Sequence, residues 1–170
     1  MAEPLVVFKV GLVVGWADAG FRIGCNSIDM SVSYLSDPLG DLVRLALLAA
    51  TGADEAHITF DGEGQAWRIE FATIAAPEPG KPGLMQLTVR DGASAEFDRQ
   101  GVLFRGDCAT YEFAGQVLRE ALSVRDAYLA IWQRAVCPPA ALYALQAALD
   151  VLAPGEPPAT RRPSRPPPDR

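Results

Sequence analysis

Five segments of this chain alternate apolar and polar side chains with a period of two, and this alternation constrains the fold more than any other feature. The segments are residues 21–25, 27–34, 57–61, 67–71 and 85–90. Successive side chains of a β-strand point to opposite faces, so each segment predicts a strand with one apolar and one polar face. Strands of this kind are typical of an antiparallel sheet that is covered on one face only.

Two of these segments predict a hairpin, because only residues 62–65 lie between the runs "HITFD" and "AWRIEF". In the register that this short loop favours, Phe60 lies opposite Trp67 on the apolar face. The polar face of the same hairpin then carries two cross-strand pairs, Thr59 with Arg68 and His57 with Glu70.

The stretch "SYLSDPLGDLVRLALLAATG", residues 33–52, predicts a capped helix. Asp37 is a good N-cap residue, and Pro38 suits the first helical position, where its missing N–H is not needed. Gly52 is placed to end the helix in the left-handed conformation. An apolar stripe at helical spacing predicts the buried side of this helix, and its members are Leu39, Leu42, Val43, Ala46 and Leu47.

Two further helices are predicted after the last strand signals, over residues 110–135 and from the prolines at 138 and 139 to residue 152. The order along the chain is strands, one helix, more strands and two helices. This order predicts an α+β fold, a two-layer sandwich in which a mainly antiparallel sheet of about six or seven strands has one face covered by about three helices.

Composition is typical of a soluble globular protein, with 49% hydrophobic and 21% charged residues. No apolar run approaches the roughly 20 residues that a membrane-spanning helix needs. The start "MAEPLVVFKVGLVVG" lacks the basic beginning and small-residue cleavage site of a signal peptide, so we expect a first strand there and a cytoplasmic protein.

The chain is predicted to form one domain over residues 1–152, followed by a disordered tail over residues 153–170. The tail holds seven of the fourteen prolines and four arginines, against Glu156 and Asp169. Subtracting its net charge of +2 from the total of −6 leaves −8 on residues 1–152. An acidic body repels phosphate backbones, so we expect no nucleic-acid binding through the folded domain.

The motifs of common cofactor and metal sites are absent from the sequence. There is no phosphate-binding loop, dinucleotide fingerprint or nucleophile elbow. Cys25, Cys108 and Cys137 are widely spaced and accompany a single histidine, so we predict buried free thiols and no metal site. We also predict no cofactor.

The polar side of the predicted sheet is the best candidate for a functional surface. One interpretation is catalytic, with His57 as a base oriented by Glu70, or with Asp61 and Glu63 as an acid/base pair. The alternative is a solvated cross-strand ladder that stabilises the sheet. We assign no catalytic residue, and we predict a partner-binding face made of Asp29, Ser31, His57, Thr59, Asp61, Arg68 and Glu70.

Residues 6–152 resemble a family of small bacterial proteins of uncharacterised function. The resemblance depends on "SYLSDPLGDLVRLALLAATG", on the acidic turn in "FDGEGQAWRIEF" and on the long helix "EFAGQVLREALSVRDAYLAIWQ". Family members more often carry Glu-Pro-Gly-Glu at the turn, so residues 62–65 depart from that pattern. Some members resemble immunity proteins of toxin systems, which implies a partner-binding role.

We therefore expect a non-catalytic binding protein, immunity-like or regulatory, whose acidic body steers it toward a basic protein such as a toxin. An enzyme that uses His57 with Glu70, or Asp61 with Glu63, is the alternative. A third possibility is a structural protein whose polar sheet face packs against its own copy, and the sequence leaves the oligomeric state open.

Overall fold

Seven strands and three helices make up the described part of the computed structural model, which covers residues 4–10, 15–33, 35–76, 83–92, 101–131 and 139–152. The strands are β1 (Pro4–Val10), β2 (Trp16–Ile23), β3 (Asn26–Ser33), β4 (Glu55–Asp61), β5 (Ala66–Ala75), β6 (Leu84–Asp91) and β7 (Val102–Ala109). The helices are α1 (Pro38–Ala50), α2 (Thr110–Ile131) and α3 (Pro139–Leu152).

The predicted α+β class is confirmed, with antiparallel strands and three packed helices. The strands form two sheets, one of order β1-β2-β3 and one of order β4-β5-β6-β7. Within each sheet, strands that follow one another in the sequence pair with each other, so each sheet is a simple meander. The division into two sheets was not part of the sequence prediction, since alternation identifies the apolar face of a strand without naming its neighbours.

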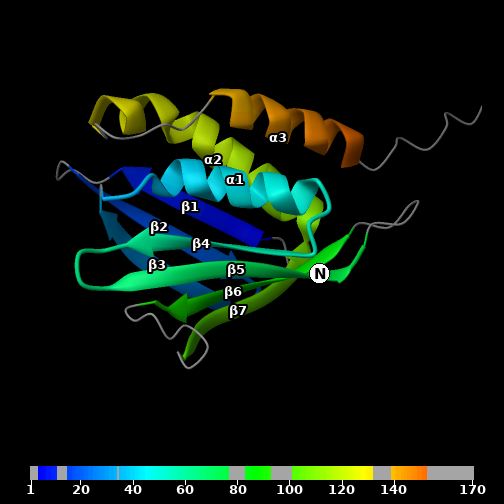
Figure 1. Cartoon of the computed structure of the whole chain (residues 1–170), viewed down its shortest axis with the longest axis horizontal. Coiled ribbons are helices and arrows are strands. Elements are labelled where there is room, and N and C mark those ends of the chain that lie inside the picture. The colour runs from blue at the N-terminus through cyan, green and yellow to red at the C-terminus, as the bar shows by residue number, and fades with distance from the viewer. Residues whose placement is uncertain are drawn as a thin grey trace, which may run out of the picture.

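The three helices gather on one side of the molecule and the strands on the other (Figure 1). Helix α1 packs against β4, and α2 packs against β1 and both other helices. The apolar faces of both sheets and of the helices meet in one core, in which Phe8 of β1 lies edge-on against Tyr128 of α2 with ring centroids 5.6 Å apart. The predicted stripe of α1 lies in this core, with Leu47 only partly buried.

Helix α1 begins and ends as its sequence predicts. The Asp37 side chain accepts a hydrogen bond from the backbone N–H of Gly40, and Pro38 occupies the first helical position. Gly52, just after the helix, has φ of 88°, the left-handed conformation that glycine adopts readily. The polar residues at the start of this helix therefore have structural roles.

Two details differ from expectation or lie outside the described residues. Cys25 is exposed in the connection between β2 and β3, so the prediction of a buried thiol is wrong there and holds for Cys108. Cys137 and residues 153–170 lie outside the described residues. Within the described part, no helix is both long and apolar enough to cross a membrane.

Candidate functional site

The hairpin of β4 and β5 has the predicted register. Phe60 pairs with Trp67 on the inner face, and His57 pairs with Glu70 on the outer face. The turn that joins the strands begins with Asp61, whose Oδ1 accepts a hydrogen bond of 2.8 Å from the backbone N–H of Glu63. This side-chain bond favours the turn conformation and helps hold Glu63 at a φ of 56°, which non-glycine residues adopt infrequently.

Glu70 is the centre of a charged cluster on the outer face of the four-stranded sheet. Its Oε2 accepts a hydrogen bond of 2.9 Å from Nε of Arg68, two residues away on the same side of β5. Its Oε1 accepts a bond of 2.7 Å from Nε of Arg90 on β6. One carboxylate therefore bridges two guanidinium groups, and all three side chains are about one-quarter exposed.

The two arginines determine the charge state of Glu70. Burial opposes the ionised carboxylate, but the hydrogen bonds and positive charges of Arg90 and Arg68 outweigh this effect and lower the pKa of Glu70 below its usual 4.5. A carboxylate with a lowered pKa is a weak base at neutral pH. The Glu70 carboxylate therefore offsets the repulsion between two arginines that lie on the neighbouring strands β5 and β6.

The remaining members of the proposed acid/base sets do not assemble with Glu70. His57 is exposed, and no hydrogen bond or ion pair joins it to another described residue. Asp61 is engaged by the turn, and Glu63 is exposed at its tip. This geometry therefore does not support an acid/base pair of His57 with Glu70, although the two residues lie opposite each other in the register. It does not support an acid/base pair of Asp61 with Glu63 either.

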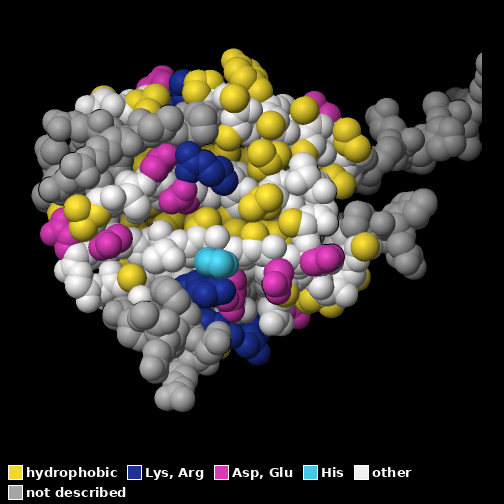
Figure 2. All heavy atoms as spheres, viewed as in Figure 1, with side chains coloured by type: hydrophobic (Ala, Val, Ile, Leu, Met, Phe, Trp, Pro, Cys, Tyr) yellow, Lys and Arg dark blue, Asp and Glu magenta, His cyan; other side chains and the backbone are white. Residues whose placement is uncertain are grey.

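The outer face around His57 has mixed charge. Arg105 of β7 follows Thr88 in the row that starts with His57 and Glu70, so three arginines lie on this face. In Figure 2 the histidine is bordered by basic and acidic side chains, while hydrophobic side chains gather over the helices. The acidic side chains that the sequence predicts lie at the edge of this face and not at its centre. Glu55 of β4 and Asp107 of β7 are at one end of the strands.

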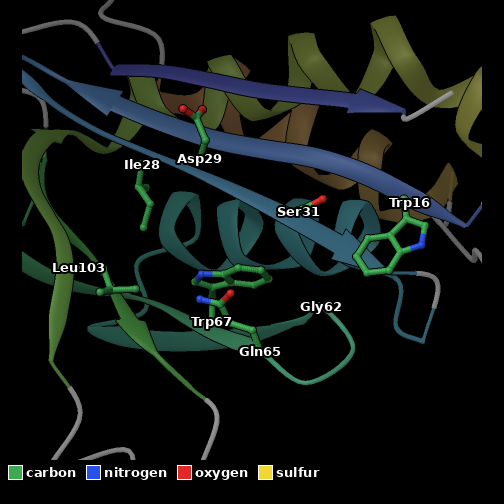
Figure 3. A pocket seen from close by; sticks show the side chains of 8 residues that line it. All are labelled: Trp16, Ile28, Asp29, Ser31, Gly62, Gln65, Trp67 and Leu103. Carbon is green, nitrogen blue, oxygen red and sulfur yellow. The ribbon is translucent and has the colours of Figure 1, made fainter. Parts of the chain in front are cut away.

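A groove of about 520 Å³ lies at the seam between the two sheets (Figure 3). Strand β3 supplies one wall. The hairpin of β4 and β5, together with the start of β7, supplies the other. The lining residues are Trp16, Ile28, Asp29, Ser31, Gly62, Gln65, Trp67 and Leu103.

Two contacts hold β3 along this seam. At one end, the side-chain amide of Asn26 donates a hydrogen bond of 2.9 Å to the backbone carbonyl of Arg105. At the other end, a Cβ on Gly62 would lie 2.7 Å from the ring of Trp67 and 2.9 Å from the carbonyl oxygen of Ser31. Glycine is therefore the residue that lets the turn, the indole and β3 approach so closely.

A second hollow of about 400 Å³ lies on the outer face of the three-stranded sheet and shares Asp29 and Ser31 with the groove. Its floor includes Gly20, above which the Asp29 carboxylate lies, since a Cβ on Gly20 would be 2.7 Å from Oδ1. Asp18 accepts a hydrogen bond of 3.4 Å from the Ser31 hydroxyl at the same place. Asp29 itself makes no hydrogen bond or ion pair to another described residue.

Comparisons with family models, with curated proteins and with solved structures found no match to this chain.

The seven residues of the predicted partner-binding face divide into two sets. Asp29 and Ser31 lie on β3 at the groove, and the other five lie on the hairpin of β4 and β5. The sets meet at the turn, where Asp61 precedes Gly62 and Gly62 approaches Ser31. Each of the seven is at least partly exposed.

Sequence reasoning missed Arg90 and the groove itself. Arg90 belongs to the polar side of a strand that was predicted, but its bond to Glu70 joins residues 20 positions apart. The groove needs β3 to lie beside the hairpin, a relationship that no local pattern encodes. Trp16, the first residue of β2, also lines the groove and is partly buried.

No group of three or more histidine, cysteine, aspartate or glutamate side chains is arranged to hold a metal ion among the described residues. Cys108, the buried thiol, lies near two carboxylates. Burial and the charges of Glu112 and Asp107 raise its pKa to about 12. Such a thiol stays protonated at neutral pH and is unsuited to nucleophilic attack.

Proposed function

We propose that this chain is a non-catalytic protein-binding module, immunity-like or regulatory, whose partner is a basic protein. Its contact surface is the outer face of the hairpin of β4 and β5, continued by Asp29 and Ser31 of β3. The observation that carries the proposal is the bridge from Glu70 to Arg68 and Arg90. It makes this face a fixed polar surface and occupies both oxygens of the carboxylate that catalysis would need.

The charge distribution supports a basic partner. Residues 1–152 carry a formal net charge of −8, from a total of −6 and a tail of +2. A field of that sign speeds the approach of a basic protein and disfavours acidic ones. At short range, basic groups of the partner would pair with the exposed carboxylates of Asp29 and Glu55. These two carboxylates lie at the edge of the contact surface, around the mixed-charge centre formed by Glu70 and its two arginines.

A site-specific photo-crosslinker at Thr59 tests the proposal. Thr59 is exposed on the outer face, and an equivalent crosslinker at the exposed Asp150 of α3 is the matched control. In an extract of the source cells, the Thr59 position should give one discrete product at low salt that disappears at about 1 M salt, where the Debye length falls to roughly 3 Å.

Three outcomes would contradict the proposal. The first is the absence of a product from Thr59. The second is an equal product from Asp150, which would show that contact is unrelated to this face. The third is a product of twice the mass of the chain, which would indicate that the face packs against its own copy.

A further inference from the structure

Helix α3 is apolar on its inner side and on its outer side. The inner side holds Leu142, Leu145 and Leu149, which are buried. On the outer side Tyr143 is 77% exposed and Val151 is 85% exposed, more than any other large apolar side chain that the structure describes. A surface helix normally turns polar residues toward water, and a helix that is apolar all round is normally covered on every side.

The outermost positions of α3 have the spacing of a seam between two helices. Opposite the buried leucines lie four exposed residues, Ala140, Ala144, Ala147 and Val151, at successive separations of four, three and four positions. This alternation is that of the a and d positions of a coiled coil, and alanine there lets a second helix approach closely. In Figure 1 α3 is the outer edge of the helical layer, and in Figure 2 hydrophobic side chains gather over it.

The order of these separations favours a second copy of the same helix. Four, three and four read the same in both directions, so an antiparallel copy related by a two-fold axis presents a matching seam. Ala144 then lies against Ala147 of the second copy. Ala140 lies against Val151 of the second copy, so the largest side chain of the seam meets one of the smallest.

The charge of α3 supports the antiparallel direction. Asp150 is the only charged residue of the helix, and it is exposed near the C-terminal end. In the antiparallel pair its carboxylate lies beside the first turn of the other copy's α3, where free N–H groups and the helix dipole favour a negative charge. A parallel pair would instead bring the Asp150 carboxylates of both copies to the same end.

We propose that two copies of this chain form a homodimer by antiparallel pairing of α3 along the seam of Ala140, Ala144, Ala147 and Val151. The helix has 14 residues, and a helix of that length spans about 21 Å. One pair of such helices makes a contact at the low end of the range of protein–protein interfaces. The dimer should therefore dissociate on dilution through the micromolar range.

This inference goes beyond the proposed function, because it uses the helical layer and leaves the outer face of the β4–β5 hairpin free on both copies. Salt distinguishes the two contacts. Binding of a basic partner weakens as salt rises, whereas two copies that each carry a net charge of −6 should pair more tightly once their repulsion is screened. A crosslinker at Asp150 should then give a product of twice the chain mass, which differs from a product with a partner protein. Absence of the dimer would leave the proposed function intact.

Sedimentation equilibrium of the full chain, over a hundredfold range of micromolar concentrations, tests the dimer. The average mass should rise from one chain toward two, and at lower concentration in about 1 M salt than in about 0.1 M salt. Ala147→Glu should keep the chain monomeric throughout, because it places a carboxylate against Ala144 of the second copy. The matched control, Gln146→Glu, adds the same charge one position away from the seam and should still dimerise. Both positions are exposed, and circular dichroism checks that both variants fold.

Disulfide formation tests the direction of the pair. Ala140→Cys and Val151→Cys variants, each in a Cys25→Ser and Cys137→Ser background, are mixed and oxidised. The mixed disulfide should exceed both self-disulfides, because equivalent positions in an antiparallel pair lie 11 residues apart, or roughly 16 Å along the axis.

Four outcomes would overturn the proposal. They are a wild-type chain that stays monomeric at every concentration, a dimer that persists in Ala147→Glu, an equal loss of the dimer in Gln146→Glu, and an excess of self-disulfides, which would indicate parallel helices.

Discussion

The hydroxyl of Tyr128 in α2 donates a hydrogen bond of 2.9 Å to Oδ1 of Asp37, which lies 91 residues earlier in the sequence. The same oxygen accepts the capping bond from the backbone N–H of Gly40. Arg44, about two turns into α1, lies 3.7 Å from the other oxygen of Asp37. The start of α1 is therefore fixed to α2 through a single capping carboxylate.

Tyr128→Phe should reduce the free energy of unfolding by about 1–3 kcal/mol, because it removes a hydrogen bond to a charged group while keeping the buried ring. Urea unfolding at pH 7 measures the change. Tyr143→Phe is the control, since Tyr143 is 77% exposed on α3 and its hydroxyl faces solvent. Equal midpoints for the two variants would mean that the bond to Asp37 contributes nothing to stability.

Glu70→Gln should cost about 1–3 kcal/mol of stability at pH 7, because it leaves Arg68 and Arg90 opposite each other without the intervening carboxylate. The pKa of Glu70 is lowered in the folded state. Its contribution is therefore complete above its usual pKa of 4.5 and is lost as the pH falls through the lower folded value. The stability difference between wild type and variant should narrow below about pH 4.5.

The control for this pH dependence is Glu55→Gln, which removes an exposed carboxylate from β4, where the paired residue is Ala72. We expect a change within about 0.5 kcal/mol. A gap between wild type and the Glu70 variant that stays constant from pH 7 to pH 3 would contradict the role given to the two arginines.

Cys108 should be inert toward thiol reagents in the folded protein. It is fully buried, and its pKa of about 12 leaves little thiolate at pH 8. Relative to a thiol at the usual value of 9.0, the thiolate fraction is lower by about a thousandfold. In a Cys137→Ser background, Ellman's reagent should modify one thiol, the exposed Cys25, and reach the second only in denaturant. Two thiols that react together in buffer would rule this out.

Gly62→Ala should destabilise the protein by about 1–3 kcal/mol, because the added Cβ would overlap the ring of Trp67 and the carbonyl of Ser31. The emission of Trp67 should change as the indole is displaced. Gly101→Ala is the control, since open space surrounds that position. An alanine at position 62 that leaves both stability and emission unchanged would show that the turn does not press against β3.

Local structure was readable from the sequence because it depends on local rules. Strand alternation, the pairing of Phe60 with Trp67 and the cap at Asp37 involve residues close together in the chain. The left-handed Gly52 followed from the same reasoning, because a helix end needs a residue without a Cβ penalty. These local features are enough to predict the α+β class.

The remaining features depend on distant contacts. The bridge from Glu70 to Arg90 requires β6 beside β5, and the seam groove requires β3 beside the hairpin of β4 and β5. Thr88 illustrates the same limit. Alternation places it on the polar side of β6, yet it is only 5% exposed, between Glu70 and Arg105. Burial there comes from long neighbours on adjacent strands, which a single strand does not encode.

Both sheets are meanders that precede the long helix in the chain: β1 to β3 occupy residues 4–33, and β4 to β7 occupy residues 55–109. During synthesis on a ribosome, all seven strands therefore emerge before α2, which packs against β1 and both other helices. Helix α1 emerges earlier and packs against β4, but until α2 emerges the apolar side of β1 that it covers stays open to water, and exposed apolar surface favours aggregation. A nascent chain stalled before residue 110 should consequently be a client of holding chaperones.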